Sequence, residues 1–279
     1  MAGESVKEST YQGQAVLWEN KTANPTPLGF LTGHDYSLAY DINNAGQVVG
    51  ASCAYELGWD TSRAFLWQNG LMQNLGVLDA WPRSGASAIN DLGIVVGGVA
   101  TSASGGSQRA TLWYDGVAGY FGELPGDLIS VASDINNLGQ VVGYSGQTVW
   151  GGHACLWQSG AVQDLHTLPG YTNSTAHAIN NLGQVIGNCV DNWHQPYNFR
   201  NRAFLWENGS MQALPLLDGY QYVAALGIND QGQIVGYAGD GYIETRAVLW
   251  NPVPEPSSFL ALGSGLAGLG GVFFRRRRR

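Results

Sequence analysis

A ten-residue string that recurs five times constrains the fold of this 279-residue chain more than any other feature. Residues 178–187 read Ala-Ile-Asn-Asn-Leu-Gly-Gln-Val-Ile-Gly, and close variants occupy residues 41–50, 88–97, 134–143 and 227–236. Recurrence at a nearly constant distance is typical of repeat proteins, whose units bury apolar surface against their neighbours. The chain is therefore expected to be a series of similar units.

A second string, which ends in Leu-Trp, alternates with the first. Its tryptophans lie 49, 46, 44, 49 and 44 residues apart, at Trp18, Trp67, Trp113, Trp157, Trp206 and Trp250. This period is typical of four-stranded β-propeller blades. We expect these six tryptophans to be packing residues.

Each period contains four short segments rich in β-branched or aromatic residues, bounded by Gly, Asn, Asp or Pro. The 40 glycines and the charged fraction of only 12% favour tight turns over helices. The sequence therefore predicts an all-β fold, a β-propeller of about five to six four-stranded blades over residues 1–251. A β-solenoid is the alternative, although its coils are usually shorter.

The ends of this domain determine whether the ring closes. We expect closure by pairing of strands near residues 15–18 with strands near 246–250. Residues 2–5 precede Trp18 by a distance similar to that between the end of the ten-residue string and each later repeat tryptophan. They therefore read as the end of a repeat, which predicts an N-terminus truncated within a repeat. The first residues also lack the apolar run of a signal peptide. Further repeats upstream would imply a larger ring, or an open arc for this chain.

The connections between the segments are of two kinds. Asn181-Leu182-Gly183 predicts a hairpin with Gly in the left-handed region, and Gln68-Asn69-Gly70 predicts a second tight hairpin. These are the first and third connections of a unit, whereas the second and fourth vary in length. Alternate turns of an antiparallel sheet lie at opposite ends, so we expect a plain end and a variable-loop end. Variable loops on a regular scaffold commonly carry binding sites.

The variable loops hold all the tryptophans that lie outside the Leu-Trp strings. The candidate ligand-binding residues are Trp59, Trp81, Trp150, Trp193 and Tyr197. Exposed rings can stack on the apolar faces of sugars, and packing beneath the loops is the alternative role. We predict a non-enzymatic protein that binds polysaccharide or a surface partner through this aromatic face.

Two other functions remain open at this point. Propellers also host glycoside hydrolases and lyases, whose chemistry needs two facing carboxylates. The loop acids are Asp35, Asp60, Asp79, Asp127, Asp191, Asp218 and Asp240, and their spacing selects no pair. A purely structural repeat protein of a biofilm is the other alternative.

Charge and ligand-type residues exclude several classes of function. Residues 1–252 hold 8 basic and 20 acidic residues, a net charge of −12, which argues against a nucleic-acid partner. Cys53, Cys155 and Cys189 form no ligand-like pair and are read as buried small hydrophobes, with one disulfide as the alternative. The five histidines show no ligand spacing, so no metal or other cofactor is expected.

The C-terminal tail differs from the repeats. Residues 252–258 form a Pro-rich linker, since prolines cannot donate to a sheet ladder. An uncharged stretch follows, and its residues 259–274 predict a short transmembrane helix. The terminal run Arg275, Arg276, Arg277, Arg278 and Arg279 predicts a cytoplasmic end, with the repeats outside.

This order of elements closely resembles the PEP-CTERM sorting signal of Gram-negative bacteria. Pro254, Glu255 and Pro256 correspond to its recognition motif. The resemblance implies export, transient anchoring in the inner membrane and removal of the tail by an exosortase, in organisms that make exopolysaccharide. It implies a final location at the cell surface or in the extracellular matrix.

The repeats themselves resemble the HAF repeat of extracellular bacterial proteins, named for a His-Ala-Phe string before Leu-Trp. His153-Ala154-Cys155-Leu156-Trp157 comes nearest, and Arg replaces the His at the other positions. The resemblance covers nearly all of residues 2–250. It implies no particular activity.

Overall fold

The structure is a computed structural model that describes residues 2–7, 12–20, 22–54, 59–78, 81–102, 106–149, 151–191, 200–240 and 245–252. In these ranges the chain forms six antiparallel sheets, together with a short 3-10 helix at Trp59–Thr61. The all-β prediction is confirmed. No helix in the described ranges is long and apolar enough to cross a membrane, and the predicted span 259–274 lies outside them.

The first three sheets comprise β1 to β11. Sheet 1 contains β1 (Ala2–Lys7), β2 (Gln12–Leu17) and β3 (Thr26–Pro27). Sheet 2 contains β4 (Tyr36–Ile42), β5 (Val48–Cys53), β6 (Arg63–Gln68) and β7 (Leu71–Gly76). Sheet 3 contains β8 (Arg83–Ile89), β9 (Val95–Ala100), β10 (Gln108–Tyr114) and β11 (Val117–Tyr120).

The last three sheets repeat the same up-and-down order. Sheet 4 contains β12 (Ile129–Ile135), β13 (Val141–Thr148), β14 (Gly151–Gln158) and β15 (Ala161–His166). Sheet 5 contains β16 (Asn173–Ile179), β17 (Val185–Asp191), β18 (Arg200–Glu207) and β19 (Ser210–Ala213). Sheet 6 contains β20 (Tyr222–Ile228), β21 (Ile234–Gly239) and β22 (Thr245–Trp250).

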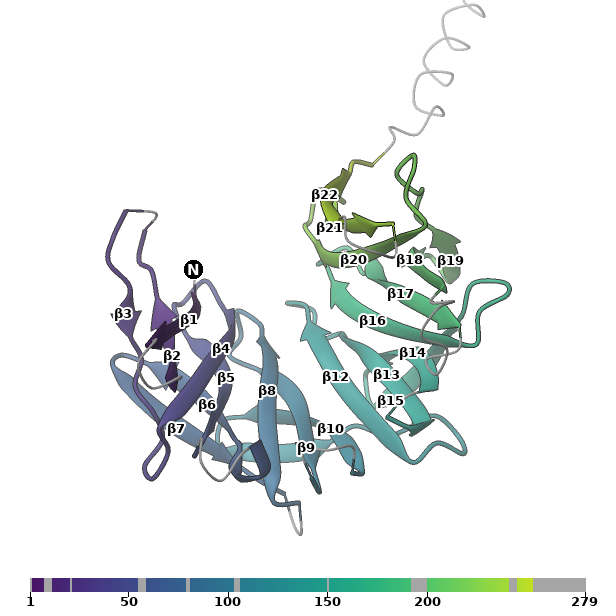
Figure 1. Cartoon of the computed structure of the whole chain (residues 1–279). Helices are drawn as coiled ribbons and strands as arrows, with labels where there is room; N and C mark the ends of the chain where they lie inside the picture. Colours follow the sequence, from purple (N-terminus) through teal and green to yellow (C-terminus); the bar gives the residue numbers. More distant parts are fainter. Residues whose placement is uncertain are drawn as a thin grey trace, which may run out of the picture.

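The sheets follow one another in an open arc, with sheet 1 and sheet 6 at separate ends (Figure 1). The expected closure of the ring, by pairing of residues near 15–18 with residues near 246–250, is therefore wrong for the described chain. There β2 pairs with β1 and β3, and β22 pairs with β21. Sheet 1 starts at the second strand of the repeat and sheet 6 stops at the third, so each end sheet has three strands.

The two tight hairpins follow from glycine and asparagine. Gly183 has φ 76°, in the left-handed region predicted for the first turn. In the third turn Asn69 and Gly70 both have positive φ, 52° and 82°, as a type I′ hairpin requires. Both hairpin predictions are confirmed.

The last glycine of the ten-residue string has a different role, because it lies inside a strand. The first strand of each complete sheet bulges by one residue, at Ser133 in sheet 4. A Cβ on the facing Gly143 would lie 1.9 Å from the carbonyl oxygen of Val131. Glycine is therefore required here for the close approach of two strands.

The core lies between successive sheets. Val142 packs toward sheet 5 in a cluster with Ala176, Ile179 and Val185, and it is fully buried. The repeat tryptophans contribute to these clusters, as predicted, and Trp157 and Trp206 are buried. Cys53, Cys155 and Cys189 are free and buried, so the reading as small hydrophobes is confirmed.

Candidate functional site

The two ends of the arc differ as the turn pattern predicts. The side-chain amide of Gln47, in the first turn of sheet 2, donates to Oε1 of Gln68 in the third turn, at 2.6 Å. Gln140 with Gln158 and Gln184 with Glu207 repeat this contact in sheets 4 and 5. The two tight turns of a sheet therefore share one end, and the variable connections share the other.

The tight-turn end is occupied by a ladder of asparagines that links the sheets. Oδ1 of Asn136 accepts from the backbone of Leu138 and Gln140, which closes its own turn. Its Nδ2 donates to the backbone oxygen of Asn180 in the next sheet, at 3.0 Å. The equivalent bonds run from Asn43 to Asn90, from Asn90 to Asn136 and from Asn180 to Asn229. These asparagines line a hollow of about 440 Å³ at this end, and their side-chain amides already make hydrogen bonds within the protein.

Two aspartates reinforce the same contacts. Oδ2 of Asp134 accepts from the backbone nitrogen of Ile179 in sheet 5, and Oδ2 of Asp41 accepts from Ile89 in sheet 3, both at 2.8 Å. Burial raises the pKa of Asp134 to about 6, against the lowering effect of these hydrogen bonds. This end is built for cohesion between sheets.

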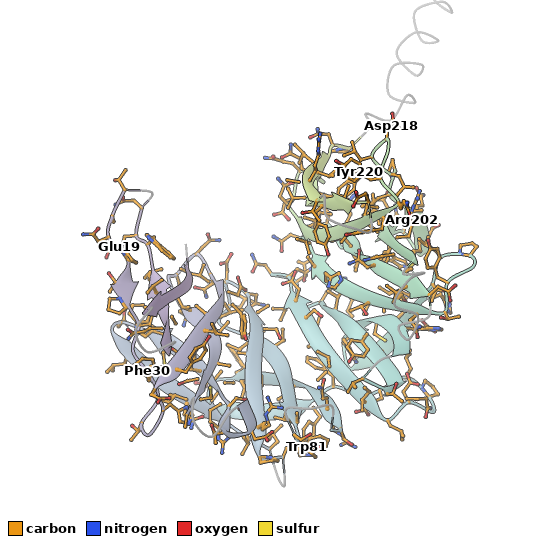
Figure 2. All side chains as sticks on the ribbon, in the orientation of Figure 1. Glu19, Phe30, Trp81, Arg202, Asp218 and Tyr220 are labelled. Carbon is orange, nitrogen blue, oxygen red and sulfur yellow. The ribbon has the colours of Figure 1, made fainter. Side chains whose placement is uncertain are left out.

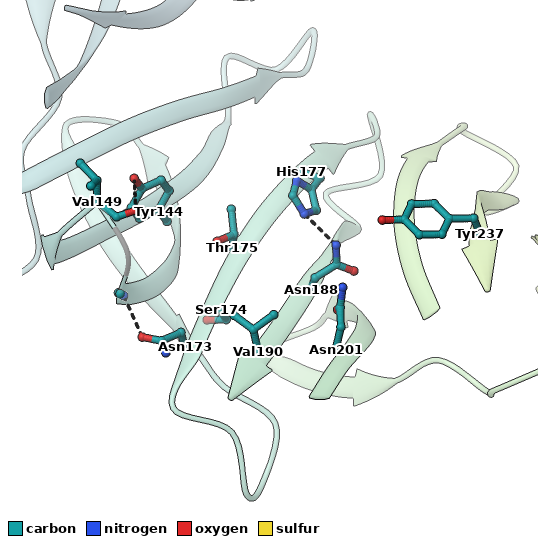
Figure 3. Close-up of a pocket in the computed structure, with 12 residues that line it drawn as sticks. Tyr144, Val149, Asn173, Ser174, Thr175, His177, Asn188, Val190, Asn201 and Tyr237 are labelled. Carbon is teal, nitrogen blue, oxygen red and sulfur yellow. Dashed lines mark hydrogen bonds between the residues drawn. The ribbon is translucent and has the colours of Figure 1, made fainter. Parts of the chain in front are cut away.

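The variable-loop end carries a cavity of about 420 Å³ between sheets 4, 5 and 6 (Figure 3). Its volume is in the range of small-ligand sites. It is lined by Tyr144, Val149, Gly151, Gly152, Asn173, Ser174, Thr175, His177, Asn188, Val190, Asn201 and Tyr237. These residues supply aromatic rings, amides and hydroxyl groups, and none of the twelve has an acidic or a permanently charged basic side chain.

His177 and Asn188 form a hydrogen-bonded pair in the cavity wall. His177 is the bulged residue of β16, and its Nε2 accepts from Nδ2 of Asn188 at 2.9 Å. Oδ1 of Asn188 accepts from the backbone of Ala225 in sheet 6, at 3.1 Å, which determines the orientation of the amide. Burial lowers the pKa of His177, so the imidazole is neutral at pH 7.

Asn201 supplies an unsatisfied acceptor to the cavity lining. Its Oδ1 is buried and has no hydrogen-bond partner among the described residues. An unpaired buried acceptor costs about 1–3 kcal/mol. Because this oxygen has almost no accessible surface, the cost lies within the cavity wall and is not a contact offered to a ligand.

Of the predicted aromatic residues, only Trp81 has a described side chain. It lies in the connection between β7 and β8 and is partly buried against sheets 2 and 3 (Figure 2). The guanidinium carbon of Arg109 lies 5.7 Å from the Trp81 ring centre and 5.4 Å from that of Tyr120. The Trp81 ring therefore makes a cation–π contact with Arg109 within the fold.

The other predicted residues are only partly placed. Trp59 begins the 3-10 helix, and nothing is described of its side chain. Trp150, Trp193, Tyr197, the sorting residues Pro254, Glu255 and Pro256, and Arg275–Arg279 lie outside the described residues. The described neighbours of two of these segments line the cavity, since Val149 and Gly151 flank Trp150, and Val190 and Asn201 lie close to the segment 192–199.

Loop acids take part in structural contacts, as two examples show. Asp127 accepts from the hydroxyl of Ser145 at 2.8 Å, and Asp60 lies 3.9 Å from the guanidinium of Arg83. Asp79 lies outside the described residues. None of the loop acids that the structure describes lines the cavity.

The lining residues of the cavity were not recognisable from the sequence. Tyr144, Thr175, Asn188 and Tyr237 lie in strands, where alternation predicts only which face a residue is on. One signal did exist at the position after the last glycine of the ten-residue string. This position holds Asn188 in one copy, and Ala51 and Tyr144 in two others.

The tail provides the match to a known family. Residues 252–279 match the PEP-CTERM protein-sorting motif. The chain carries a PEP-CTERM sorting signal. This motif marks an exported protein that exosortase sorts at the membrane. No curated protein sequence matches the chain.

Solved structures resemble the repeat region. The β-propeller domain of the Trilobed protease from Pyrococcus furiosus, described as having an open velcro topology, matches with a TM-score of 0.60 and 10% identity, over 90% of this chain and 75% of that one. A prolyl endopeptidase matches with a TM-score of 0.55 and 12% identity, over 86% of this chain but only 38% of its own length. At such identities the likeness concerns the fold alone, which resembles β-propeller domains.

Proposed function

We propose that this protein is a non-catalytic, exported binding protein whose cavity at the variable-loop end takes a segment of a neutral polysaccharide. The observation that carries the proposal is the uncharged lining of the 420 Å³ cavity, with its tyrosines, amides and hydroxyl groups. A sugar offers hydroxyl groups to such amides and an apolar face to such rings. The sorting motif supports the setting, since it directs the protein out of the cell.

The lining favours binding over hydrolysis. Glycoside hydrolysis uses a pair of carboxylates across the scissile bond, and none of the twelve described residues that line this cavity carries a carboxylate. The hydrogen bond between His177 and Asn188 is present without a ligand, which indicates a preorganised site.

Affinity electrophoresis of the full chain in the exopolysaccharide of the producing bacterium tests the proposal. We expect Y237A to weaken retardation at least tenfold, because it removes a ring from the cavity wall. Y114A is the matched control, since Tyr114 is an exposed tyrosine next to a tight turn. Near-UV circular dichroism checks that both variants fold. Unchanged retardation of Y237A, or equal loss in Y114A, contradicts the proposal.

The predicted loop residues are tested in the same gel. We expect the double variant W150A/W193A to weaken retardation further, because the described neighbours of both loops line the cavity. W81A should have a smaller effect on binding, since its ring contacts Arg109. Loss of retardation in W81A alone would move the site to sheets 2 and 3.

A further inference from the structure

Three potential metal ligands meet at the outer edge of sheet 4. Nδ1 of His153, on β14, lies 2.9 Å from Oδ2 of Asp164, on β15, and Nδ1 of His166 lies 3.2 Å from the same oxygen. One ligand atom from each residue can be chosen so that all lie within 4.8 Å of one another. Bonds of about 2.0–2.2 Å in a tetrahedral site place ligand atoms about 3–4 Å apart, so small rotations of the rings would suffice.

The spacing of these residues along the sequence predicted no metal site. They meet because β14 and β15 pair antiparallel, with Ala154 opposite His166 and Cys155 opposite Asp164. A shift of register between these two pairs places both imidazoles beside one carboxylate oxygen.

The other repeats serve as an internal comparison. Counted along the sequence, the corresponding residues are Arg63, Asn74 and Gly76 in sheet 2, and Arg202, Ala213 and Pro215 in sheet 5. Sheet 3 has Arg109, Tyr120 and Gly122. Only sheet 4, of these four, combines two histidines and a carboxylate, so the repeat scaffold does not itself require them.

The backbone positions the group in two ways. The backbone nitrogen of His166 donates to Oδ1 of Asp164 at 2.6 Å, which leaves Oδ2 directed toward the two rings. His166 has φ 64°, where the corresponding Gly76 of sheet 2 has φ 81°. A histidine thus occupies a left-handed position that glycine adopts more readily.

We infer that His153, Asp164 and His166 form a binding site for a divalent transition-metal ion such as Zn²⁺. Two imidazoles and one carboxylate suit Zn²⁺, Ni²⁺ or Cu²⁺, whereas Ca²⁺ and Mg²⁺ prefer oxygen ligands alone. The ion would replace the contacts that Oδ2 makes with the two rings. The His166 side chain is 77% exposed and that of Asp164 27%, so the site is open to solvent and leaves coordination positions for water or a ligand group.

Calorimetric titration of the full chain with Zn²⁺, in detergent and after removal of metal with EDTA, tests this site. We expect one saturable site in the wild type and at least tenfold weaker binding in H166G and in H153R. These variants restore the residues of sheet 2, so the scaffold tolerates them. Co²⁺ in place of Zn²⁺ should give visible absorption bands that both variants lose.

The control is H34Q, since His34 is a partly buried histidine bonded to Ser52 in sheet 2. It should bind Zn²⁺ as the wild type does. Thermal unfolding of the metal-free variants confirms that each is folded. No saturable binding by the wild type, or unchanged affinity in both H153R and H166G, overturns the assignment.

Discussion

One repeat position is an aspartate in two of the sheets and an apolar residue in two others. Asp134 and Asp41 each accept a backbone nitrogen from the following sheet, whereas the same position holds Ala88 and Ala178 in sheets 3 and 5. The carboxylate of Asp134 accepts hydrogen bonds from the backbone nitrogens of Ile135 and Ile179, but the burial of its charge costs free energy. Its pKa shows that burial is the larger effect.

Stability should depend on pH through Asp134. Its pKa is raised from 3.8 to about 6, so its contribution to stability is fully present below pH 3.8 and is lost as the pH rises through 6. We expect the free energy of unfolding of the wild type, relative to D134N, to fall by about 3 kcal/mol between pH 3.5 and pH 7. Urea unfolding at a series of pH values measures this difference.

The control for this prediction is D218N, because Asp218 lies exposed in the connection between β19 and β20. Its unfolding curve should follow that of the wild type at each pH. A constant difference between wild type and D134N over this pH range would show that Asp134 is not responsible.

At the scale of elements, the first hairpin of each sheet is both a turn and a joint. The sequence correctly predicted the turn from Asn and Gly. The structure adds the joint, because Nδ2 of each of Asn43, Asn90, Asn136 and Asn180 reaches the next sheet. A contact between repeats more than 40 residues apart leaves no local signal in the sequence.

The contribution of this joint can be measured with two equivalent asparagines. We expect N136A to cost about 1–3 kcal/mol more in free energy of unfolding than N229A. Both variants lose the bonds that close their own turn, but only Asn136 also reaches a following sheet in the described chain. Chemical denaturation measures both values, and equal costs would mean that the ladder bond adds nothing.

At the scale of the molecule, the arc ends on an uncovered face. Val49, Val96, Val142 and Ile186 are all fully buried by the sheet that follows theirs, whereas the equivalent Val235 of sheet 6 is 51% exposed. Leu249 on β22 is exposed as well. An open arc thus leaves apolar surface at one end, which suits a structural role by stacking as well as a role in binding.

Whether the arc is open in solution can be tested at this position. We expect V142T to cost about 1–3 kcal/mol, because it buries a hydroxyl group between sheets 4 and 5. V235T should change the free energy of unfolding by less than about 0.5 kcal/mol, since this side chain faces solvent. Thermal or urea unfolding gives both values. A cost for V235T as large as that for V142T would show that another sheet covers sheet 6.

The sequence by itself determined the repeat, the four-stranded sheets, the two kinds of turn and the sorting tail, because each depends on residues close together in the chain. Gly183 and Asn69 predict their turns from local backbone preference. Only the tertiary structure decided the open arc, the cavity around His177 and the meeting of His153 with His166. These features depend on strand register and on contacts between sheets, where a shift of one residue changes which side chains meet.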